Sequence, residues 1–413
     1  MTLQLTADQL NAQKQIMDFI ESDSQCFVIS GHAGTGKTTL IKHIQNTYNQ
    51  KYELDKLTNG DAKRLPFVYC ATTNKAAEAL AEATGDDTQT IHSLLGLRVG
   101  VDTSTGENYL FQAVKVELLS HCVLVVDEAS YVDKRLLKYI ISSTENCKVI
   151  LMGDPAQLTP VKSREVPVFT AGFQTAVLNE VVRQSKLNPI QKICADFRAH
   201  ILHGAAFPKI KLAPEVRHIP RDLFNQEVLA EFTRTDWKYS DSKLLAWRNK
   251  MVVRQNKDLF KRNTGRKTYA PDDYVVNNRY VKTKGGSLKT DQIVQIEAIE
   301  KHEEYGCQGF LVQIKESGQF FMPSKVSDHA KFTKKAVEVQ DSTMVMRIKN
   351  HWVDLRPLYA CTVNKSQGST YGKVYIDLKD FSYCRDQDLL ARMLYVAISR
   401  AKTEVIFTGD LNE

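Results

Sequence analysis

The segment from residue 31 to residue 38 has the residue types and the spacing of a phosphate-binding loop. It reads Gly-His-Ala-Gly-Thr-Gly-Lys-Thr and follows the apolar run Cys26–Ile29. Glycines allow tight turns and close backbone approach, so successive N–H groups can point at phosphate oxygens. Lys37 would reach the β- and γ-phosphates, and the Thr38 hydroxyl would hold Mg²⁺. The pattern therefore predicts binding of a nucleoside triphosphate.

Two adjacent carboxylates, Asp127 and Glu128, end the apolar run Val123–Val126. A carboxylate at the carboxyl end of a parallel strand faces the crevice in which ligands bind. Asp127 can hold Mg²⁺ through water, and Glu128 can orient and activate an attacking water molecule. An isolated Asp-Glu pair is commonly an exposed acidic turn. We favour the catalytic interpretation because the phosphate-binding loop needs such a partner strand.

Three more side chains could act on the γ-phosphate. Gln157 follows Gly153-Asp154-Pro155 and is an amide that could sense this phosphate. Arg183 and Arg400 are candidate arginine fingers, because a planar guanidinium suits the charge on a phosphoryl group in transfer. Taken alone, Gly-Asp-Pro is only a turn, and each arginine would more often form a surface ion pair.

The elements that must position these residues alternate between strands and helices. Apolar, strand-like runs occupy Cys26–Ser30, Pro66–Ala71, Cys122–Asp127 and Lys148–Gly153. Helical patterns occupy Asp8–Ser22, Lys37–Gln50, Lys75–Thr84 and Asp133–Ser143. A second set comprises strands Lys243–Trp247, Lys373–Leu378 and Glu404–Thr408 and helices Met251–Lys261 and Asp386–Ser399. This alternation predicts an α/β fold with parallel sheets covered on both faces.

Two stretches interrupt the alternation. Residues 98–112 hold a turn-rich segment between short alternating runs, which predicts a β-hairpin. Residues 268–350 show short alternating runs and glycine pairs without long helical patterns, which predicts a small β-rich insertion.

Composition restricts the class of protein. The 413 residues are 43% hydrophobic and 25% charged, as in ordinary globular proteins, and suffice for two to four domains. The apolar runs are far too short to span a membrane, and the first residues do not resemble a signal peptide. Eight cysteines form no C-x-x-C pair, which favours buried, reduced thiols over metal ligands or disulfides.

The positive charge is concentrated in one segment. Lys243 to Lys289 holds thirteen Lys and Arg residues but three acids, so it carries a local charge of +10 within a chain of +7. Such a concentration suits a polyanion, although a solvated basic surface is an equally acceptable interpretation of charge alone.

The motifs, in this order, resemble those of superfamily 1 helicases. Asp127-Glu128-Ala129-Ser130, Gly153-Asp154-Pro155-Ala156-Gln157 and the block from Val363 to Thr370 are similar to the forms in RecD-like and Dda-like enzymes of superfamily 1B. The block Ala71–Ala77 departs from that pattern, because Thr72 stands where RecD-like enzymes usually have Pro. Its Thr-Asn-Lys-Ala-Ala is closer to the UvrD-like form, which bears on the direction of translocation.

The resemblance implies two RecA-like P-loop NTPase domains that clamp ATP and Mg²⁺ between them. Domain 1A would comprise residues 1–97 and 113–182, and domain 2A residues 183–267 and 351–413. A wedge hairpin, 1B, would occupy 98–112, and an SH3-like β-barrel, 2B, would occupy 268–350. The implied activity is ATP-dependent unwinding of DNA with 5′ to 3′ translocation. The alternative is a translocase or nucleoprotein remodeller without strong unwinding.

The resemblance also implies roles for individual residues. The nucleotide would contact Gln9, Gly34, Thr35, Gly36, Lys37, Thr38, Thr39, Arg183, Gly368 and Arg400. The DNA backbone or bases would contact Thr73, His92, Trp247, Asn249, Thr362 and Ser366. Two local alternatives remain, since Gln9 can close a capping box with Thr6 and Trp247 can pack into a core.

The implied partners are single-stranded and forked DNA, with a single-stranded-DNA-binding protein or other replication proteins as further candidates. The family resemblance implies a monomer that acts in DNA replication or recombination. It would work in the cytoplasm, that of the bacterial host for a bacteriophage-encoded member.

Overall fold

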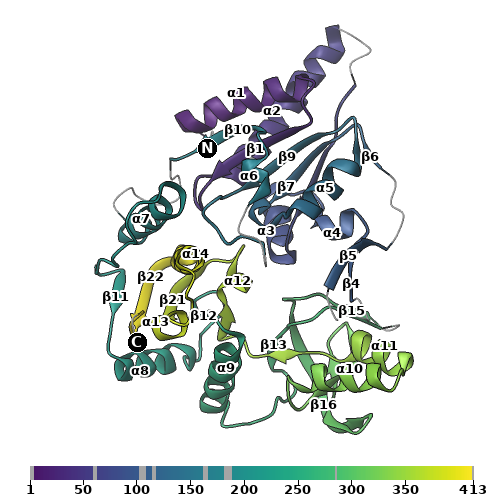
Figure 1. Ribbon diagram of the computed structural model, residues 1–413, viewed down its shortest axis with the longest axis vertical. Coiled ribbons are helices and arrows are strands. Elements are labelled where there is room, and N and C mark those ends of the chain that lie inside the picture. Colours follow the sequence, from purple (N-terminus) through teal and green to yellow (C-terminus); the bar gives the residue numbers. More distant parts are fainter. Residues whose placement is uncertain are drawn as a thin grey trace. The chain divides into compact units, whose positions relative to one another are not determined.

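The chain folds into two units, each built on a parallel β-sheet (Figure 1). This computed structural model describes residues 4–58, 63–101, 108–113, 118–160, 166–180, 188–283 and 286–411. The first unit comprises Met1–Glu215, Gln367–Ser369 and Cys384–Arg400, and the second comprises Val216–Ser366, Thr370–Tyr383 and Ala401–Glu413. The division into domains 1A, 1B, 2A and 2B, which follows other boundaries, stays a prediction.

The sheet of the first unit has the order β10-β1-β9-β7-β2-β3, and all its pairings are parallel. Its strands are β1 (Cys26–Gly31), β2 (Phe67–Ala71), β3 (Thr88–Thr90), β7 (Val123–Asp127), β9 (Lys148–Gly153) and β10 (Gln174–Leu178). The carboxyl ends of parallel strands meet at one edge. The phosphate-binding loop, Asp127 and Gly153 therefore share that edge.

Helices cover both faces of this sheet. On one face, Phe27 and Ile29 pack against α1 (Ala7–Glu21), α2 (Lys37–Thr58) and α3 (Asn74–Thr84). On the other face, Val28 and Leu124 pack against α4 (Ile91–Leu94), the 3₁₀ turn η1 (Ala129–Tyr131), α5 (Lys134–Ser142) and α6 (Pro167–Thr170). Successive strand residues point to opposite faces, and both faces are apolar here, which confirms the predicted doubly covered parallel sheet.

Further elements of the first unit flank this core. Helices α7 (Pro189–His203) and α14 (Gln387–Ser399) pack against each other. Strands β4 (Leu97–Val101) and β5 (Asn108–Gln112) pair antiparallel, with Leu97 opposite Gln112, where the sequence predicts a hairpin. Residues 102–107 between them lie outside the described residues. Strands β6 (Leu119–Ser120) and β8 (Thr144–Glu145) form a short parallel pair.

The second unit has a parallel sheet of order β11-β22-β21-β12-β20. Its strands are β11 (Val216–His218), β12 (Ser242–Ala246), β20 (Ala360–Thr362), β21 (Tyr371–Asp377) and β22 (Ala401–Thr408). Helices α8 (Arg221–Phe232) and α9 (Asn249–Thr264) pack on it through an apolar cluster that includes Phe232, Leu244 and Tyr375. Two short helices, α12 (Val363–Ser366) and α13 (Leu378–Phe381), follow β20 and β21.

A curled antiparallel sheet lies between α9 and β20 in the sequence. Its order is β18-β17-β16-β13-β19, built from β13 (Tyr274–Asn277), β16 (Ile293–Glu304), β17 (Cys307–Ile314), β18 (Gly318–Pro323) and β19 (Leu355–Arg356). The short pair β14 (Val281–Thr283) and β15 (Gly286–Leu288) accompanies it. Trp352 bridges Phe321 of β18, and Val353 N–H donates to Phe321 O at 2.8 Å. The segment that contains β19 therefore joins both ends of the sheet around an apolar interior.

Two helices lie within residues 268–350, a stretch in which the sequence shows no long helical pattern. Helices α10 (Asp328–Glu338) and α11 (Ser342–His351) occupy the end of this stretch. Asp341 caps α11 by accepting from Met344 N–H at 2.9 Å. Phe332, Ala336, Met344 and Ile348 recur at helical spacing and pack on Trp352. Helices α7 and α8 also fall where the sequence analysis proposes no element.

The cysteines, the hydropathy of the helices and the grouping of metal-ligating side chains restrict the possible functions. All eight cysteines are free thiols and seven are buried, in agreement with the sequence prediction. In the described part of the chain, no helix is both long and apolar enough to cross a membrane. Within the same residues, no group of three or more His, Cys, Asp or Glu side chains could hold a metal ion.

The closing tryptophan of the curled sheet gives a test of this architecture. Trp352 is fully buried, with its ring 4.8 Å from that of Phe321 and 5.7 Å from that of Phe332. We expect Trp352→Ala to lower the free energy of unfolding of the second unit by about 3–5 kcal/mol, measured by urea titration. Val337→Ala on α10 is the control, because Val337 is exposed and should change stability by less than about 0.5 kcal/mol. Equal effects of the two changes would contradict the assigned core.

Candidate nucleotide-binding site

The phosphate-binding loop connects β1 to α2. Gly34 and Gly36 have φ angles of 88° and 76°, which side chains with a Cβ rarely adopt. Lys37 Nζ donates to Gly31 O at 2.7 Å and to His32 O at 3.2 Å, so its ammonium lies inside the loop. Because α2 begins at Lys37, the positive end of its dipole and the loop N–H groups favour an anion at the same place.

Gln9 connects α1 to this loop. Its Oε1 accepts from Thr6 N–H at 3.0 Å and Thr6 Oγ1 accepts from Gln9 N–H at 3.3 Å, which confirms the capping box. Its Nε2 also donates to Thr35 O at 3.0 Å. The capping role and a position beside the loop therefore coexist, and contact of Gln9 with adenine stays a prediction.

Asp127 and Glu128 stand at the end of β7. Glu128 has φ 53° and ψ 43°, a left-handed conformation that is uncommon for a residue with a side chain. Asp127 Oδ1 accepts from Glu128 N–H at 2.8 Å, and Thr72 Oγ1 donates to Glu128 O at 3.2 Å. These bonds hold the turn that presents the Glu128 carboxyl. Thr72, the residue at which the sequence departs from the RecD-like pattern, thus supports the turn at Glu128.

Both carboxyl groups are perturbed by their surroundings. Burial raises the pKa of Asp127 above its ordinary value, while nearby Lys37 opposes the rise. Burial, and then the neighbouring Asp127 charge, raise the pKa of Glu128 to about 7. Arg400 and Lys37 partly offset this rise. A carboxyl group with a pKa near neutrality suits a general base.

Arg400 lies within electrostatic reach of Glu128, as the shift in the Glu128 pKa shows. Its buried guanidinium donates to Val396 O at 3.2 Å, Ser369 O at 3.2 Å and Ser399 Oγ at 2.9 Å. These bonds fix the position of the charge at the end of α14. The structure therefore brings Lys37, Asp127, Glu128 and Arg400 into one electrostatic group.

Asp154, which the sequence analysis did not select, organises the loop after β9. This fully buried carboxylate forms an ion pair with Arg198 of α7 and accepts hydrogen bonds from the Tyr395 hydroxyl of α14 and from Ala156 N–H. A buried acid with a buried arginine is stable only when both charges are paired. The Gly-Asp-Pro turn was visible in the sequence, but its partners were not.

Gln157, in the same loop after β9, is held by Gln367 and by Arg392 of α14. Its Oε1 accepts from Gln367 Nε2 at 3.0 Å, and its backbone O accepts from Arg392 Nη1 at 2.8 Å. Arg392 also donates to Pro155 O at 2.7 Å. Gln367 and Arg392 are thus further positioning residues. Gln367 could have been selected from the sequence, because it belongs to the motif block from Val363 to Thr370. No sequence motif points to Arg392.

The other residues that the sequence predicts at the nucleotide site differ in their exposure. Thr35 is buried, Thr38 is half-buried at the second residue of α2, and Thr39 is exposed. Gly368 has φ 76°, and a Cβ there would lie 3.4 Å from Ala76 N, so this glycine passes close to the start of α3. Arg183 lies outside the described residues.

The donor set fits Mg²⁺ bound with a nucleotide. Mg²⁺ takes oxygen ligands and usually needs one or two protein ligands in addition to phosphates and water. Thr38 supplies a hydroxyl after the loop, and Asp127 supplies a carboxylate within electrostatic reach of Lys37. These two residues would hold the ion, which neutralises charge on the transferred phosphoryl group when bound.

The residues predicted to contact DNA already have local partners. In the first unit, Thr73 Oγ1 caps α3 by accepting from Ala76 N–H at 3.2 Å. Half-buried His92 lies on α4, where burial lowers the pKa of its imidazole and nearby Asp133 opposes this.

In the second unit, two of these predicted contacts lie at the carboxyl ends of neighbouring strands. Ala246 of β12 pairs with Thr362 of β20, so Trp247 and Thr362 share one edge. Trp247 is half-buried and Asn249 is exposed, whereas Ser366 is fully buried and donates to Val363 O at 2.7 Å. Their roles toward DNA stay predictions.

Comparison with protein families gives two matches. A family model described as AAA domain matches residues 4–206, and a model described as UvrD-like helicase C-terminal domain matches residues 357–408. The first covers the nucleotide-binding sheet. The second covers β20 to β22, with Arg400.

Three curated proteins and one solved structure are similar to the chain. It is 34% identical over 202 residues to the ATP-dependent DNA helicase dda of Enterobacteria phage T4, covering 47% of this chain and 42% of that protein. It is 31% identical over 182 residues to the ATP-dependent RecD2 DNA helicase of Deinococcus radiodurans, covering 43% of this chain and 22% of that protein. An uncharacterized protein of Acanthamoeba polyphaga mimivirus is 24% identical over 513 aligned residues, covering 97% of this chain and 99% of that protein.

The solved structure concerns DNA unwinding at forked double-stranded DNA by two coordinating Pif1 helicases. Its TM-score is 0.52 at 17% identity, and it covers 98% of this chain and 92% of that chain. This likeness shows the fold. In sequence, the chain covers less than half the length of the two named helicases.

The raised pKa of Glu128 predicts a pH-dependent stability. Between the ordinary value of 4.5 and about 7, the folded chain holds a proton that the unfolded chain releases, so stability falls as pH rises through this window. Glu128→Gln should therefore be more stable than the wild type at pH 8, by up to about 3 kcal/mol, and similar at pH 4. Urea titration of the first unit at both pH values measures this. Glu82→Gln, at an exposed position, is the control, and a variant gain that is equal at both pH values would contradict the assignment.

Proposed function

We propose that the chain is an ATP-dependent DNA helicase of the Dda-like and RecD-like group of superfamily 1B, and that it moves 5′ to 3′ on single-stranded DNA. The AAA-domain match over residues 4–206 and the similarity to two named helicases support this proposal. One observation carries the catalytic part of this proposal. Lys37, the adjacent pair Asp127 and Glu128, and Arg400 come from three distant parts of the chain and form one electrostatic group at the carboxyl edge of the first parallel sheet.

Each member of this group has a distinct task in hydrolysis. Lys37 and the loop N–H groups bind the phosphates of ATP, and Thr38 and Asp127 hold Mg²⁺. Glu128 accepts a proton from the attacking water, since its pKa of about 7 keeps it near half ionised at neutral pH. Arg400 stabilises charge on the γ-phosphoryl group, and Arg183 is proposed for the same task on sequence grounds.

DNA binding is proposed to depend on the backbone of the strand. Thr73, His92, Asn249 and Thr362 carry hydroxyl, imidazole and amide groups, which position phosphates without reading sequence. Ser366 was predicted with them, but it is fully buried and its hydroxyl donates to Val363 O, so we propose that it holds this segment in place rather than touching DNA. The edge at which β12 and β20 end, with Trp247 for base stacking, supports this role in the second unit. Single-stranded and forked DNA are the proposed substrates. A single-stranded-DNA-binding protein is a proposed partner of a monomeric enzyme.

The antiparallel pair of β4 and β5 is the proposed wedge at the duplex junction, and the curled sheet of the second unit is the proposed SH3-like domain. Both are insertions between elements of the parallel sheets. The alternative function is that of a translocase or remodeller that hydrolyses ATP on DNA without strong unwinding. Assays on duplexes with a 5′ tail, a 3′ tail or no tail separate the two, because ATPase without strand separation favours the alternative.

Lys37 and Glu128 should fail in different ways. Lys37→Ala removes a phosphate ligand and should weaken nucleotide binding as well as turnover. Glu128→Gln keeps the shape of the side chain, so nucleotide should still bind while DNA-stimulated ATPase falls by about 10²–10⁴-fold. Fluorescent-nucleotide titration and steady-state ATPase separate the two effects. Near-normal turnover in Glu128→Gln would remove its catalytic assignment.

Arg400 has a signature beyond loss of rate. Arg400→Ala should lower DNA-stimulated ATPase by about 10³-fold or more and leave single-strand binding largely intact. Because Arg400 holds down the pKa of Glu128, the residual activity should depend on pH with an apparent pKa above that of the wild type. Arg400→Lys keeps the charge and should restore the pH profile better than the rate. Lys402→Ala, at an exposed position, is the control, and a wild-type profile in Arg400→Ala would make Arg400 structural.

The wedge is tested by shortening it. Replacement of residues 102–109 by a short Gly-Ser turn should leave the parallel sheet folded, because hairpin tips tolerate shortening. ATPase and translocation should persist while unwinding of a 5′-tailed duplex drops sharply in a gel-based strand-separation assay. Wild-type unwinding would show that the wedge lies elsewhere, and loss of ATPase would show that the segment is structural.

A further inference from the structure

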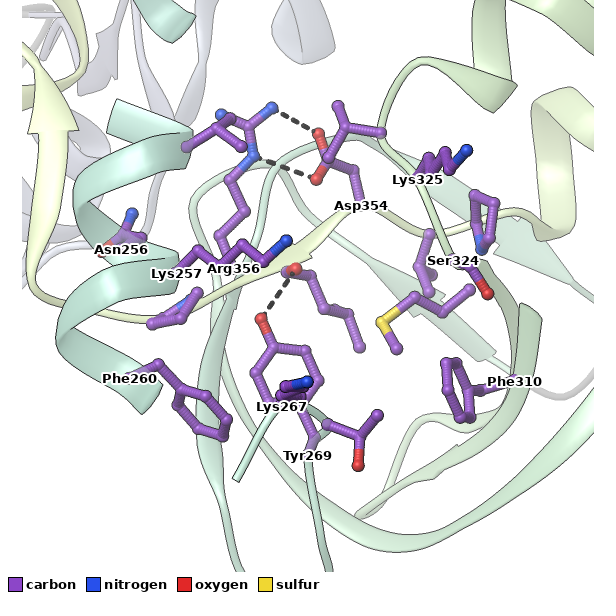
Figure 2. Close-up of a pocket in the computed structure, with 18 of the residues that line it drawn as sticks. Asn256, Lys257, Phe260, Lys267, Tyr269, Phe310, Ser324, Lys325, Asp354 and Arg356 are labelled. Atoms are coloured by element: carbon purple, nitrogen blue, oxygen red, sulfur yellow. Dashed lines mark hydrogen bonds and ion pairs between the residues drawn. The ribbon is translucent and has the colours of Figure 1, made fainter. Parts of the chain in front are cut away.

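A cavity of about 470 Å³ lies in the second unit between α9 and the curled sheet (Figure 2). Its wall on one side is the helix face with Val253 and Phe260, and on the other side it is Phe310 and Met322 of the curled sheet. Tyr269 also lines it and is labelled in Figure 2. This volume falls in the range of about 300–1,000 Å³ that is typical of ligand pockets. The nucleotide site described above shares no residue with it.

Two neutral polar side chains of the lining are already satisfied. Asn256 accepts from Ala360 N–H at 2.8 Å and donates to Ala360 O at 2.9 Å. The Tyr269 hydroxyl donates to Leu355 O at 3.1 Å. Both groups therefore serve the fold, and neither has its main hydrogen-bonding capacity left for a ligand.

The ionised pair of the lining is also satisfied. Asp354 binds Arg356 through two hydrogen bonds of 3.0 Å and 2.7 Å (Figure 2). Arg356 also donates to Asn249 Oδ1 at 2.6 Å. His329 contacts Val353 O at 3.1 Å through Nε2. A nucleobase in this cavity would lose water from several donors and acceptors, while the side chains of Asn256, Tyr269 and Asp354 are already paired, which is unfavourable. The interior therefore favours an apolar side chain.

The mouth of the cavity is positively charged. Lys257, Lys267 and Lys325 line it with exposed side chains, and none of them forms an ion pair within the part of the chain that the structure describes. The carboxylate of Asp354 does not offset them, because Arg356 neutralises it. Val326, another lining residue, is 40% exposed and adds apolar surface. Three lysines around an apolar interior fit a ligand with an apolar group that enters the cavity and acidic groups that stay near its opening.

We propose that this cavity binds an acidic peptide segment of a partner protein, in which one large apolar side chain is flanked by carboxylates. The apolar side chain fills the space between Val253, Phe260 and Met322, where its burial stabilises the complex. The flanking carboxylates lie near Lys257, Lys267 and Lys325, which steer the encounter and select against basic or neutral segments. This binding does not depend on ATP hydrolysis, so its test is independent of the proposed helicase activity.

The test measures binding of a fluorescein-labelled peptide, Asp-Glu-Asp-Phe-Asp-Glu, to the full chain. Fluorescence anisotropy reports the bound fraction at 50 and 200 mM NaCl. We expect saturable binding that weakens with salt, because screening reduces the attraction of exposed charges. A peptide with Ser in place of Phe, and one with amides in place of the acids, should each bind at least tenfold more weakly.

Variants of the protein locate the binding. The double change Lys257→Glu with Lys267→Glu, and the cavity-filling change Val253→Trp, should each reduce affinity at least tenfold. Lys261→Glu is the matched control, because Lys261 is exposed on α9 but does not line the cavity. It should change affinity less than threefold. Circular dichroism melts show whether the variants are folded. If a variant is not folded, the test still rests on the unmodified protein, whose affinities for the original and the substituted peptides are compared.

Several outcomes would overturn the proposal. Binding that Lys261→Glu reduces as much as the double change would be unspecific attraction to a basic surface. Displacement of the peptide by thymidine monophosphate at equal or lower concentration would make the cavity a nucleotide subsite. Concentration-dependent dimers in sedimentation velocity that Val253→Trp abolishes would assign it to a second copy of the chain. Absence of saturable binding at 50 mM NaCl would reject it outright.

Discussion

The buried carboxylate of Asp154 is the constraint on which the first unit depends. It stands at the end of β9 with no exposure to solvent, and its charge is stabilised by Arg198 of α7, the Tyr395 hydroxyl and Ala156 N–H. Because loss of any partner would leave a buried polar group unsatisfied, these segments are held together at one point. The same contacts fix α14, whose last turn leads to Arg400. A structural ion pair therefore sets the position of the charge that acts on Glu128.

The candidate active site concentrates groups that are unfavourable for folding. Glu128 adopts a left-handed backbone conformation, and its burial beside Asp127 raises its pKa to about 7. Left-handed conformations and buried like charges each cost free energy, which the surrounding hydrogen bonds must offset. Thr72 and the Asp127 side chain supply two of these bonds. The non-RecD-like residue at position 72 thus has a structural use in this chain, which weakens any inference from it about the direction of translocation.

Strands buried on both faces could be predicted from the sequence, while contacts between distant residues could not. The predicted strand Lys148–Gly153 agrees with β9 at both ends, because the apolar run that forms it stops at Gly153, before the buried acid Asp154. The partners of Asp154 lie 44 and 241 residues away along the chain, and no local pattern announces them. Helices α10 and α11 were missed because they are short, 11 and 10 residues, and each buries only three of its residues. The residues of the phosphate-binding loop could be selected from the sequence because phosphate chemistry fixes their spacing.

The basic segment from Lys243 to Lys289 shows why a charge count is a weak guide to partners. Three of its cations serve the fold: Lys243 donates to Leu358 O, Arg248 binds buried Asp380, and Arg266 binds Asp273. Other cations of the segment are exposed along α9 and at the cavity mouth, where Lys257 and Lys267 surround an apolar interior rather than a flat polar surface. A DNA backbone needs regularly spaced cations, whereas an acidic peptide with an apolar side chain needs cations around a pocket. The cations of this basic stretch are thus distributed among internal hydrogen bonds and ion pairs, the proposed strand-binding edge and the lining of the proposed peptide-binding cavity.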